Sequence, residues 1–130
     1  MLTALSHTSY VNERKRKNKK IQSYERLEFL GDAVVELLVC TSLYENYNNL
    51  SEGNMAQIKA AVASEDILSE IAKNLNLGTF ILFGKGEETS GGRNKKSILA
   101  DVFEALVAAV FIDSKKNLKI VSQIFSPLLD

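Results

Sequence analysis

The sequence contains very few of the side chains that bind zinc or form disulfides. Its 130 residues include one cysteine, Cys40, one histidine, His7, and no tryptophan. A single cysteine forms no disulfide within the chain, so we expect a reduced, cytoplasmic setting and a Cys40 that packs in the core. Zinc sites and di-iron helical bundles both use several histidines or cysteines, so neither is expected here.

Long apolar runs are also missing. No stretch of about 18 apolar residues without charge occurs, so the sequence predicts no membrane span and no membrane partner. No charged start followed by an apolar block resembles a signal peptide. The composition, 45% hydrophobic and 25% charged, is typical of one compact globular domain.

An alternating strand pattern is absent too, which predicts an all-α fold. Ser51 and Ser64 are expected N-caps, and Pro127 is expected to end the last helix. The predicted helices are 25–45, one from about 52, 65–75, 95–113 and one from about 116 to Pro127. The stretch 84–94 holds four of the seven glycines and predicts an exposed loop.

Charge sums to zero but is unevenly spread. The segment 13–20, ERKRKNKK, carries six basic residues and one acid, which leaves the rest of the chain acidic. A basic segment on an acidic body suggests a polyanionic partner. A solvated, flexible loop is an equally open interpretation, because charge runs of this kind are common.

The predicted helix 25–45 is mostly apolar, yet it carries an acidic stripe. Its acids follow the i, i+3, i+4 spacing of one helical face, and they are Glu25, Glu28, Asp32 and Glu36. No Lys or Arg lies between positions 27 and 58 to neutralise them. The stripe therefore needs partners from elsewhere in the chain or from solution.

A second apolar helix carries a similar pair. Thirteen of the fifteen residues in 98–112 are apolar, and the two exceptions, Asp101 and Glu104, share a face. Burying an unpaired carboxylate costs on the order of several kcal/mol. No Lys or Arg lies between 97 and 114, so a divalent cation is one expected partner. Alternatively, these acids sit at a polar edge, where they cap or bridge neighbouring segments.

The donor type narrows the metal and the chemistry. Carboxylates are hard oxygen donors, which suit Mg²⁺ or Mn²⁺. Such a metal with open positions suits phosphoryl chemistry. The residues alone thus predict a metal-dependent phosphodiesterase with nucleic acid as the natural substrate, and a phosphohydrolase of small nucleotides remains an alternative.

Several segments also resemble a known family. YERLEFLGDAVVELLV, at 24–39, resembles the signature of the ribonuclease III endonuclease domain. LTALSHTSY, SEGNMAQIKAAVAS and GKGEETSGGRNKKSILADVFEALVAAVFID resemble other segments of that domain, in the same order and at similar spacing. The likeness covers nearly the whole chain and is greatest to the bacterial type.

The resemblance implies a Mg²⁺-dependent endonuclease, in which Mn²⁺ can substitute, that cuts double-stranded RNA as a homodimer. Its products would carry 5′-phosphates and short 3′ overhangs, in processing such as that of ribosomal RNA precursors. The matched catalytic and metal-binding acids are Glu28, Asp32, Asp101 and Glu104, with Glu25 and Glu52 as supporting acids. Phe29 matches an aromatic that the family inserts into its dimer partner.

Basic residues are expected to contact RNA phosphates. They are Arg14, Lys15, Arg16 and Lys17 of the basic segment and Arg93, Lys95 and Lys96 near the second acidic helix.

Two departures from the family pattern qualify the resemblance. The family usually has a further helix before the segment that starts at Leu2, and a double-stranded-RNA-binding domain after the region ending at Asp130. We therefore expect residues 1–130 to be an isolated endonuclease domain without that first helix. A non-catalytic RNA-binding or dimerisation module that keeps the fold is the second hypothesis.

Overall fold

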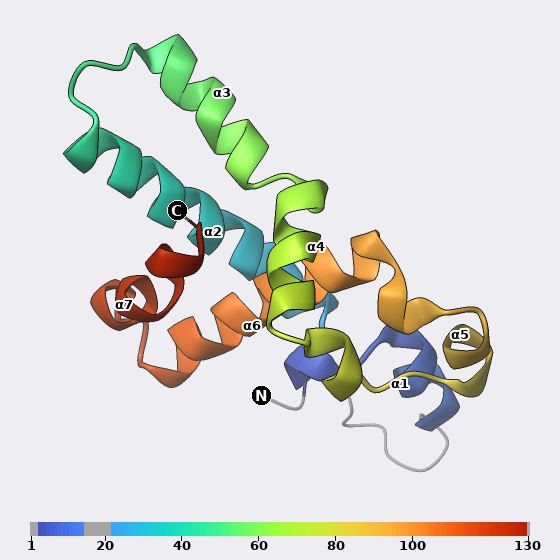
Figure 1. The fold of residues 1–130 in the computed structure, drawn as a ribbon. Coiled ribbons are helices and arrows are strands. Elements are labelled where there is room, and N and C mark those ends of the chain that lie inside the picture. The colour runs from blue at the N-terminus through green and yellow to red at the C-terminus, as the bar shows by residue number, and fades with distance from the viewer. Residues whose placement is uncertain (1–2, 15–21, 130) are drawn as a thin grey trace.

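In the computed structural model, residues 3–14 and 22–129 are described, and they form helices of which α2, α4 and α7 pack on a central helix, α6 (Figure 1). In chain order the elements, with η for a 3-10 helix, are η1 (Thr3–Leu5), α1 (Thr8–Arg14), α2 (Glu25–Asn46), α3 (Glu52–Val62), α4 (Glu65–Asn74), η2 (Leu77–Phe80), α5 (Lys85–Thr89), η3 (Gly92–Asn94), α6 (Lys96–Asp113) and α7 (Leu118–Leu129). The described residues form no strand, only an isolated parallel bridge between Ser6 and Leu82. The predicted all-α fold is confirmed.

The core lies around α6, as expected for a helix that is apolar on nearly every side. Helices α2, α4 and α7 all contact α6. Val102, Phe103 and Ala105 of α6 are completely buried, and Val35 of α2 is buried against the same core. The ring of Phe103 meets Phe125 of α7 edge to face. Burial of this apolar surface is the main stabilising contribution to the domain.

The predicted N-caps are confirmed at the starts of α3 and α4. The hydroxyl of Ser51 accepts a hydrogen bond from the Asn54 amide, and that of Ser64 accepts one from Ile67. Helix α3 buries no residue, and Figure 1 shows it beside the second half of α2, away from α5 and α1. None of the helices in the described part of the chain combines the length and apolarity needed to cross a membrane.

Three sequence predictions were wrong in detail. Pro127 lies inside α7 rather than ending it. The helix ends only two residues later, at Leu129, so the missing N–H of Pro127 removes a single hydrogen bond from the last turn, which the helix tolerates. The stretch 84–94 is not simply an exposed loop: it forms α5 and η3, and Gly84 and Gly92 are buried. Cys40 is exposed rather than in the core, since α2 turns its other face, with Val35 and Val39, inward.

Gly31 marks a very close approach of α2 to α6. A Cβ on Gly31 would lie 1.8 Å from the backbone carbonyl oxygen of Glu104, far inside van der Waals contact. This oxygen is part of a helix backbone, so it cannot rotate away as the end of a side chain could. The absence of a side chain at position 31 therefore sets the separation of the two acidic helices.

Gly31→Ala should force α2 and α6 apart and destabilise the domain by at least the roughly 1–3 kcal/mol that overpacking costs. The matched control is Gly53→Ala in α3, where the new Cβ would meet only the Ser51 hydroxyl at 4.0 Å. Because Gly53 lies in the first turn of α3, alanine there should raise the stability by no more than the roughly 0.5–1 kcal/mol gained in a helix interior. Urea unfolding measures both variants, and a Gly31→Ala protein as stable as wild type would contradict the close approach.

Candidate metal centre

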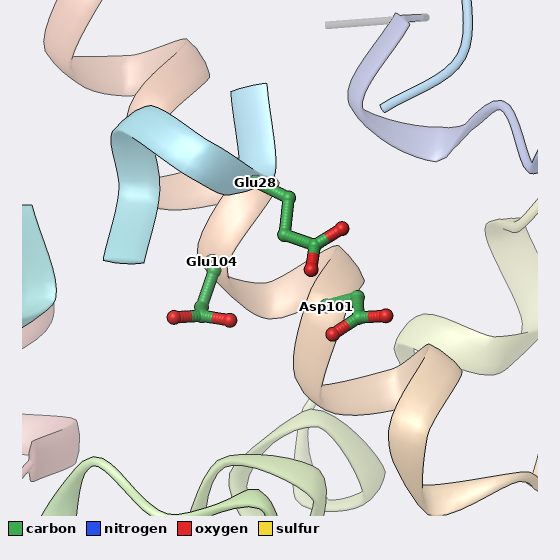
Figure 2. Close-up of side chains that lie close together, drawn as sticks. All are labelled: Glu28, Asp101 and Glu104. Carbon is green, nitrogen blue, oxygen red and sulfur yellow. The ribbon is translucent and has the colours of Figure 1, made fainter. Parts of the chain in front are cut away.

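Three carboxylates from two helices converge beside Gly31. Glu28 comes from the first turn of α2, and Asp101 and Glu104 come from successive turns of α6. One oxygen of each lies within 4.8 Å of the others. Figure 2 shows the three side chains ending close together, with Glu28 reaching across from its own helix.

Burial makes the charged forms of these acids unfavourable. Glu104 is 9% exposed, and Glu28 and Asp101 are half-buried. Burial, together with the adjacent Asp32 carboxyl, raises the pKa of Glu104 to about 8. Burial and the charge of Asp101 raise the pKa of Glu28 to about 7, and burial also raises the pKa of Asp101. The cluster therefore favours protons or a cation.

The donor set fits a divalent cation. None of the ion pairs formed between described residues involves Glu28, Asp101 or Glu104. Three carboxylates in reach of one another are hard oxygen donors of the kind that Mg²⁺ and Mn²⁺ bind. A bound cation would relieve the mutual repulsion that burial intensifies.

Asp32 lies at the open side of this group. It is exposed, and its carboxyl contacts that of Glu104. Together with Glu25, Glu28, Phe29 and Glu104 it lines a pocket of about 450 Å³ that opens to solvent. Of the four acids predicted as metal ligands, three thus form the tight cluster and the fourth borders the pocket.

Glu25 is held at the pocket edge by hydroxyl groups. Its Oε1 accepts hydrogen bonds from Thr8 Oγ1 at 3.0 Å and from Ser23 Oγ at 3.1 Å. Tyr24, the residue before α2, is buried, and its pKa is raised by burial and by the nearby charges of Asp101 and Glu28. Sequence reasoning missed Thr8 and Tyr24, and the only signal for Tyr24 was its place directly before the acidic helix.

Glu52 does not join this group within the single chain. It begins α3, which contacts α2 and α4, and it is exposed. It does not line the acidic pocket described above. Its supporting role stays a prediction.

The predicted RNA-contacting bases near α6 all have partners inside the domain. Arg93 Nη1 donates to the carbonyls of Gly78 at 2.7 Å and Ile81 at 2.9 Å, and Arg93 Nε pairs with Glu88. Lys95 pairs with Glu87 at 2.6 Å, and Lys96 pairs with Asp66 at 3.2 Å. The guanidinium of Arg93 thus holds the η2 segment in place.

The basic segment is only partly described. Arg14 ends α1, and its guanidinium lies 5.5 Å from the centre of the Tyr10 ring. Lys15, Arg16 and Lys17 lie outside the described residues. Their contact with RNA stays a prediction.

A larger pocket adjoins the acidic one. Its volume is about 830 Å³, and it lies between the N-terminal part of α2 and the C-terminal part of α6, with Leu27, Leu30 and Ile112 among its apolar walls. Glu25 and Phe29 line both pockets. Phe29 is 84% exposed, more than any other large apolar side chain among the described residues.

The sequence matches a family model described as Ribonuclease-III-like over residues 1–128. It is 49% identical over 126 residues to Ribonuclease 3 of Pseudothermotoga lettingae, a match that covers 96% of this chain and 52% of that protein. It is 43% identical over 129 residues to Ribonuclease 3 of Enterococcus faecalis, covering 98% and 55%. The chain thus spans about half the length of these curated relatives.

The fold is also similar to solved structures. One is the nuclease domain of ribonuclease III from Campylobacter jejuni, with a TM-score of 0.87 and 37% identity, covering 98% of this chain and 82% of that one. That protein is described as flexible in a region involved in dimer formation. A second structure of the same domain gives a TM-score of 0.85.

The raised pKa values predict an unusual pH dependence of stability. Burial raises the pKa of Glu28 from 4.5 to about 7 and the pKa of Glu104 from 4.5 to about 8 on folding. Their contribution to stability is therefore complete below pH 4.5 and is lost as pH rises through 7 and 8. Without metal, the thermal midpoint should fall by a few degrees between pH 5 and pH 9 on this account.

Glu104→Gln should show a smaller fall over the same range, while Glu70→Gln, which removes an exposed carboxylate of α4, should keep the wild-type slope. Adding Mg²⁺ at pH 8 should raise the wild-type midpoint, because a ligand that binds only the folded state stabilises it. Thermal unfolding by circular dichroism measures each case. Identical slopes for wild type and Glu104→Gln would contradict the raised pKa of Glu104.

Proposed function

The chain belongs to the ribonuclease-III-like family, and from this we propose that it is the nuclease domain of an endonuclease that hydrolyses double-stranded RNA with Mg²⁺. The family resemblance predicted from the sequence is confirmed by the matches. The observation that carries the proposal is the convergence of Glu28, Asp101 and Glu104, without a basic partner among the described residues.

The proposed roles follow from where each acid lies. Glu28, Asp101 and Glu104 would hold Mg²⁺, or Mn²⁺ in its place. When bound, the metal supplies a Lewis acid and lowers the pKa of a coordinated water. Asp32, exposed beside Glu104, is placed to accept a hydrogen bond from a water entering the pocket. Glu25, held in place by Thr8 and Ser23, would keep the edge of the acidic pocket open for an RNA strand.

The openness of the acidic pocket favours a polymer over a free nucleotide. Its walls are four carboxylates and one phenyl ring, and none of them is a cation that could bind the several charges of a nucleoside triphosphate. A duplex presents one phosphate at a time, with the remaining contacts spread over its backbone and read by shape. The proposed products, 5′-phosphate ends with short 3′ overhangs, and a role in ribosomal RNA processing rest on the family resemblance.

The same geometry supports a homodimer as the working form. Phe29 projects into solvent between the acidic pocket and the larger apolar one. In a two-fold arrangement, Phe29 of each copy can enter the larger pocket of the other, since a two-fold interface buries the same patch on both subunits. An exposed phenyl beside a pocket of about 830 Å³ is a self-complementary pair of features. This would also place the two acidic pockets along one duplex.

The central prediction is metal-dependent cleavage of duplex RNA. Incubated with long double-stranded RNA at low salt and high protein concentration, the chain should produce fragments with Mg²⁺ and none with EDTA. Asp32→Asn and Glu104→Gln should each lower the rate by more than the roughly 10–100-fold that loss of an outer-shell partner costs. Glu45→Gln, an exposed acid later in α2, is the matched control and should cut normally.

The alternatives give distinct results in the same assay. Duplex binding without any cleavage by the folded wild type would indicate a non-catalytic RNA-binding module. Release of phosphate from free nucleotides, with duplex RNA left intact, would indicate a small-molecule phosphohydrolase. Near wild-type cleavage by Asp32→Asn or Glu104→Gln would refute the assignment of that acid.

The dimer is tested separately from catalysis. Sedimentation equilibrium should give twice the mass of one chain for wild type. Phe29→Ala should weaken dimerisation by at least about 30-fold, since truncating a central interface anchor costs about 2 kcal/mol or more. Phe80→Ala, a phenyl 59% exposed in η2 and outside the larger pocket, should dimerise normally. Equal dimer constants for the two variants would refute the role of Phe29.

A further inference from the structure

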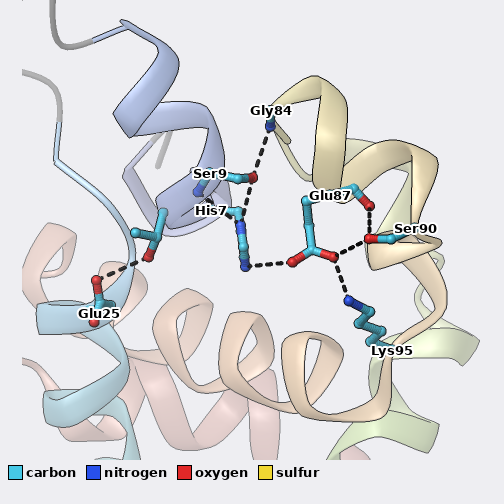
Figure 3. A network of polar contacts seen from close by, with 8 residues as sticks. His7, Ser9, Glu25, Gly84, Glu87, Ser90 and Lys95 are labelled. Atoms are coloured by element: carbon cyan, nitrogen blue, oxygen red, sulfur yellow. Dashed lines mark hydrogen bonds and ion pairs between the residues drawn. The ribbon is translucent and has the colours of Figure 1, made fainter.

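Glu87, on α5, joins two segments that are distant in sequence. Its Oε2 accepts hydrogen bonds from Lys95 Nζ at 2.6 Å and Ser90 Oγ at 2.9 Å. Its Oε1 lies 3.9 Å from Nε2 of His7, a polar contact that becomes an ion pair when His7 is protonated, and burial lowers the pKa of His7. Figure 3 shows the carboxylate in the middle of this network. Its side chain is 19% exposed, and the hydrogen bonds from Lys95 and Ser90 lower the pKa of Glu87, so it stays charged.

On one side, the network reaches the start of α2. The ring of His7 lies 5.9 Å from the ring of Tyr24, centre to centre, and 5.2 Å from that of Phe83. The backbone carbonyl of Tyr24 accepts a hydrogen bond from the Glu28 amide at 2.8 Å. Tyr24, which His7 contacts, therefore fixes the first turn of α2, the helix that carries Glu28.

His7 is itself held in place. Its Nδ1 lies 2.8 Å from Ser9 Oγ, and the same hydroxyl oxygen accepts a hydrogen bond from the Gly84 amide at 2.9 Å. The His7 amide donates to the Leu82 carbonyl at 3.1 Å. These contacts fix the chain before α1 against the segment that leads into α5, which carries Glu87.

On the other side, the network reaches the start of α6. Lys95 immediately precedes α6, and this helix start has no side-chain cap. The carbonyl of Lys95 accepts from the Leu99 amide at 3.0 Å, and Asp101 follows in the next turn. The bond from Lys95 to Glu87 is therefore a direct restraint on where the first turn of α6 lies.

We propose that Glu87 is a positioning residue for the metal centre. Through His7 on one side and Lys95 on the other, it fixes the start of α2 relative to the start of α6, and hence Glu28 relative to Asp101. This inference rests on the proposed metal binding. Glu87 itself lies outside the cluster of three carboxylates and outside the acidic pocket.

Positioning and simple electrostatics predict opposite signs for Lys95. If Lys95 acts only through its charge, its removal should strengthen the binding of a cation, because the repulsion between two positive charges is lost. If Lys95 instead helps to place α6, its removal should weaken binding in spite of the charge change. Loss of the Glu87 charge weakens binding on either account, so Lys95→Gln is the decisive variant.

The experiment is a titration with Mn²⁺ of the wild-type chain, Glu87→Gln, Lys95→Gln and the double variant, followed by the electron paramagnetic resonance signal of free Mn²⁺. Each single variant should bind Mn²⁺ roughly 2- to 30-fold more weakly, the range in which networks couple distant sites. The double variant should bind no more weakly than the weaker single one, because both changes break one connection. Thermal unfolding beforehand ensures that each titrated protein is folded.

Two neighbours serve as matched controls. Glu88→Gln removes the adjacent acid of α5, which pairs with Arg93 instead of Lys95, and Lys96→Gln removes the adjacent base, which pairs with Asp66. Neither should weaken Mn²⁺ binding beyond twofold.

Lys95→Gln binding Mn²⁺ as tightly as wild type, or more tightly, would overturn the inference, as would equal weakening by Glu87→Gln and Glu88→Gln. If Glu87→Gln does not fold, Lys95→Gln decides alone. A wild-type chain that binds no Mn²⁺ is a different result, because it refutes the proposed metal centre and the inference together.

Discussion

The close approach of α2 to α6 at Gly31 is the constraint on which the site depends. Two helices in ordinary contact are separated by their side chains, but here a Cβ would lie 1.8 Å from the backbone of the partner helix. Because the backbones come this close, Glu28 on α2 can reach Asp101 and Glu104 on α6. The apolar residues around Gly31 hold this approach, since α6 is packed by α2 on one side and α4 on another.

The domain tolerates the acidic cluster because the apolar core around it offsets the cost of burying three carboxylates. Three carboxylates within reach of one another, each with its pKa raised by burial, are unfavourable when all are charged. Fully buried residues on the same helix, such as Phe103, contribute the apolar burial that offsets this cost. Carboxylates that the packed helices hold close together, each with a raised pKa, are placed to bind a cation. The adjoining position of Phe29 links this site to the surface proposed for dimerisation.

Sequence reasoning reached much of the fold, and it found the acidic face on each of the two helices, because helical spacing and capping are local patterns. Helical spacing placed Asp101 and Glu104 on one face, and serine caps marked where α3 and α4 begin. It was wrong where the burial of a residue depends on which face of its helix another helix covers. Cys40 has apolar neighbours in sequence but faces solvent, because only one face of α2 is covered there.

The sequence by itself determined an all-α chain with two apolar helices, an acidic face on each, and no nearby base to neutralise them. Only the tertiary structure decided that these faces meet, that Asp32 stays exposed at the pocket, and that Arg93 is bonded to carbonyls of the domain. It also decided that Glu87 lies between His7 and Lys95. The physical reason is that periodicity and capping act within a few residues, whereas contacts between helices depend on packing across the whole core.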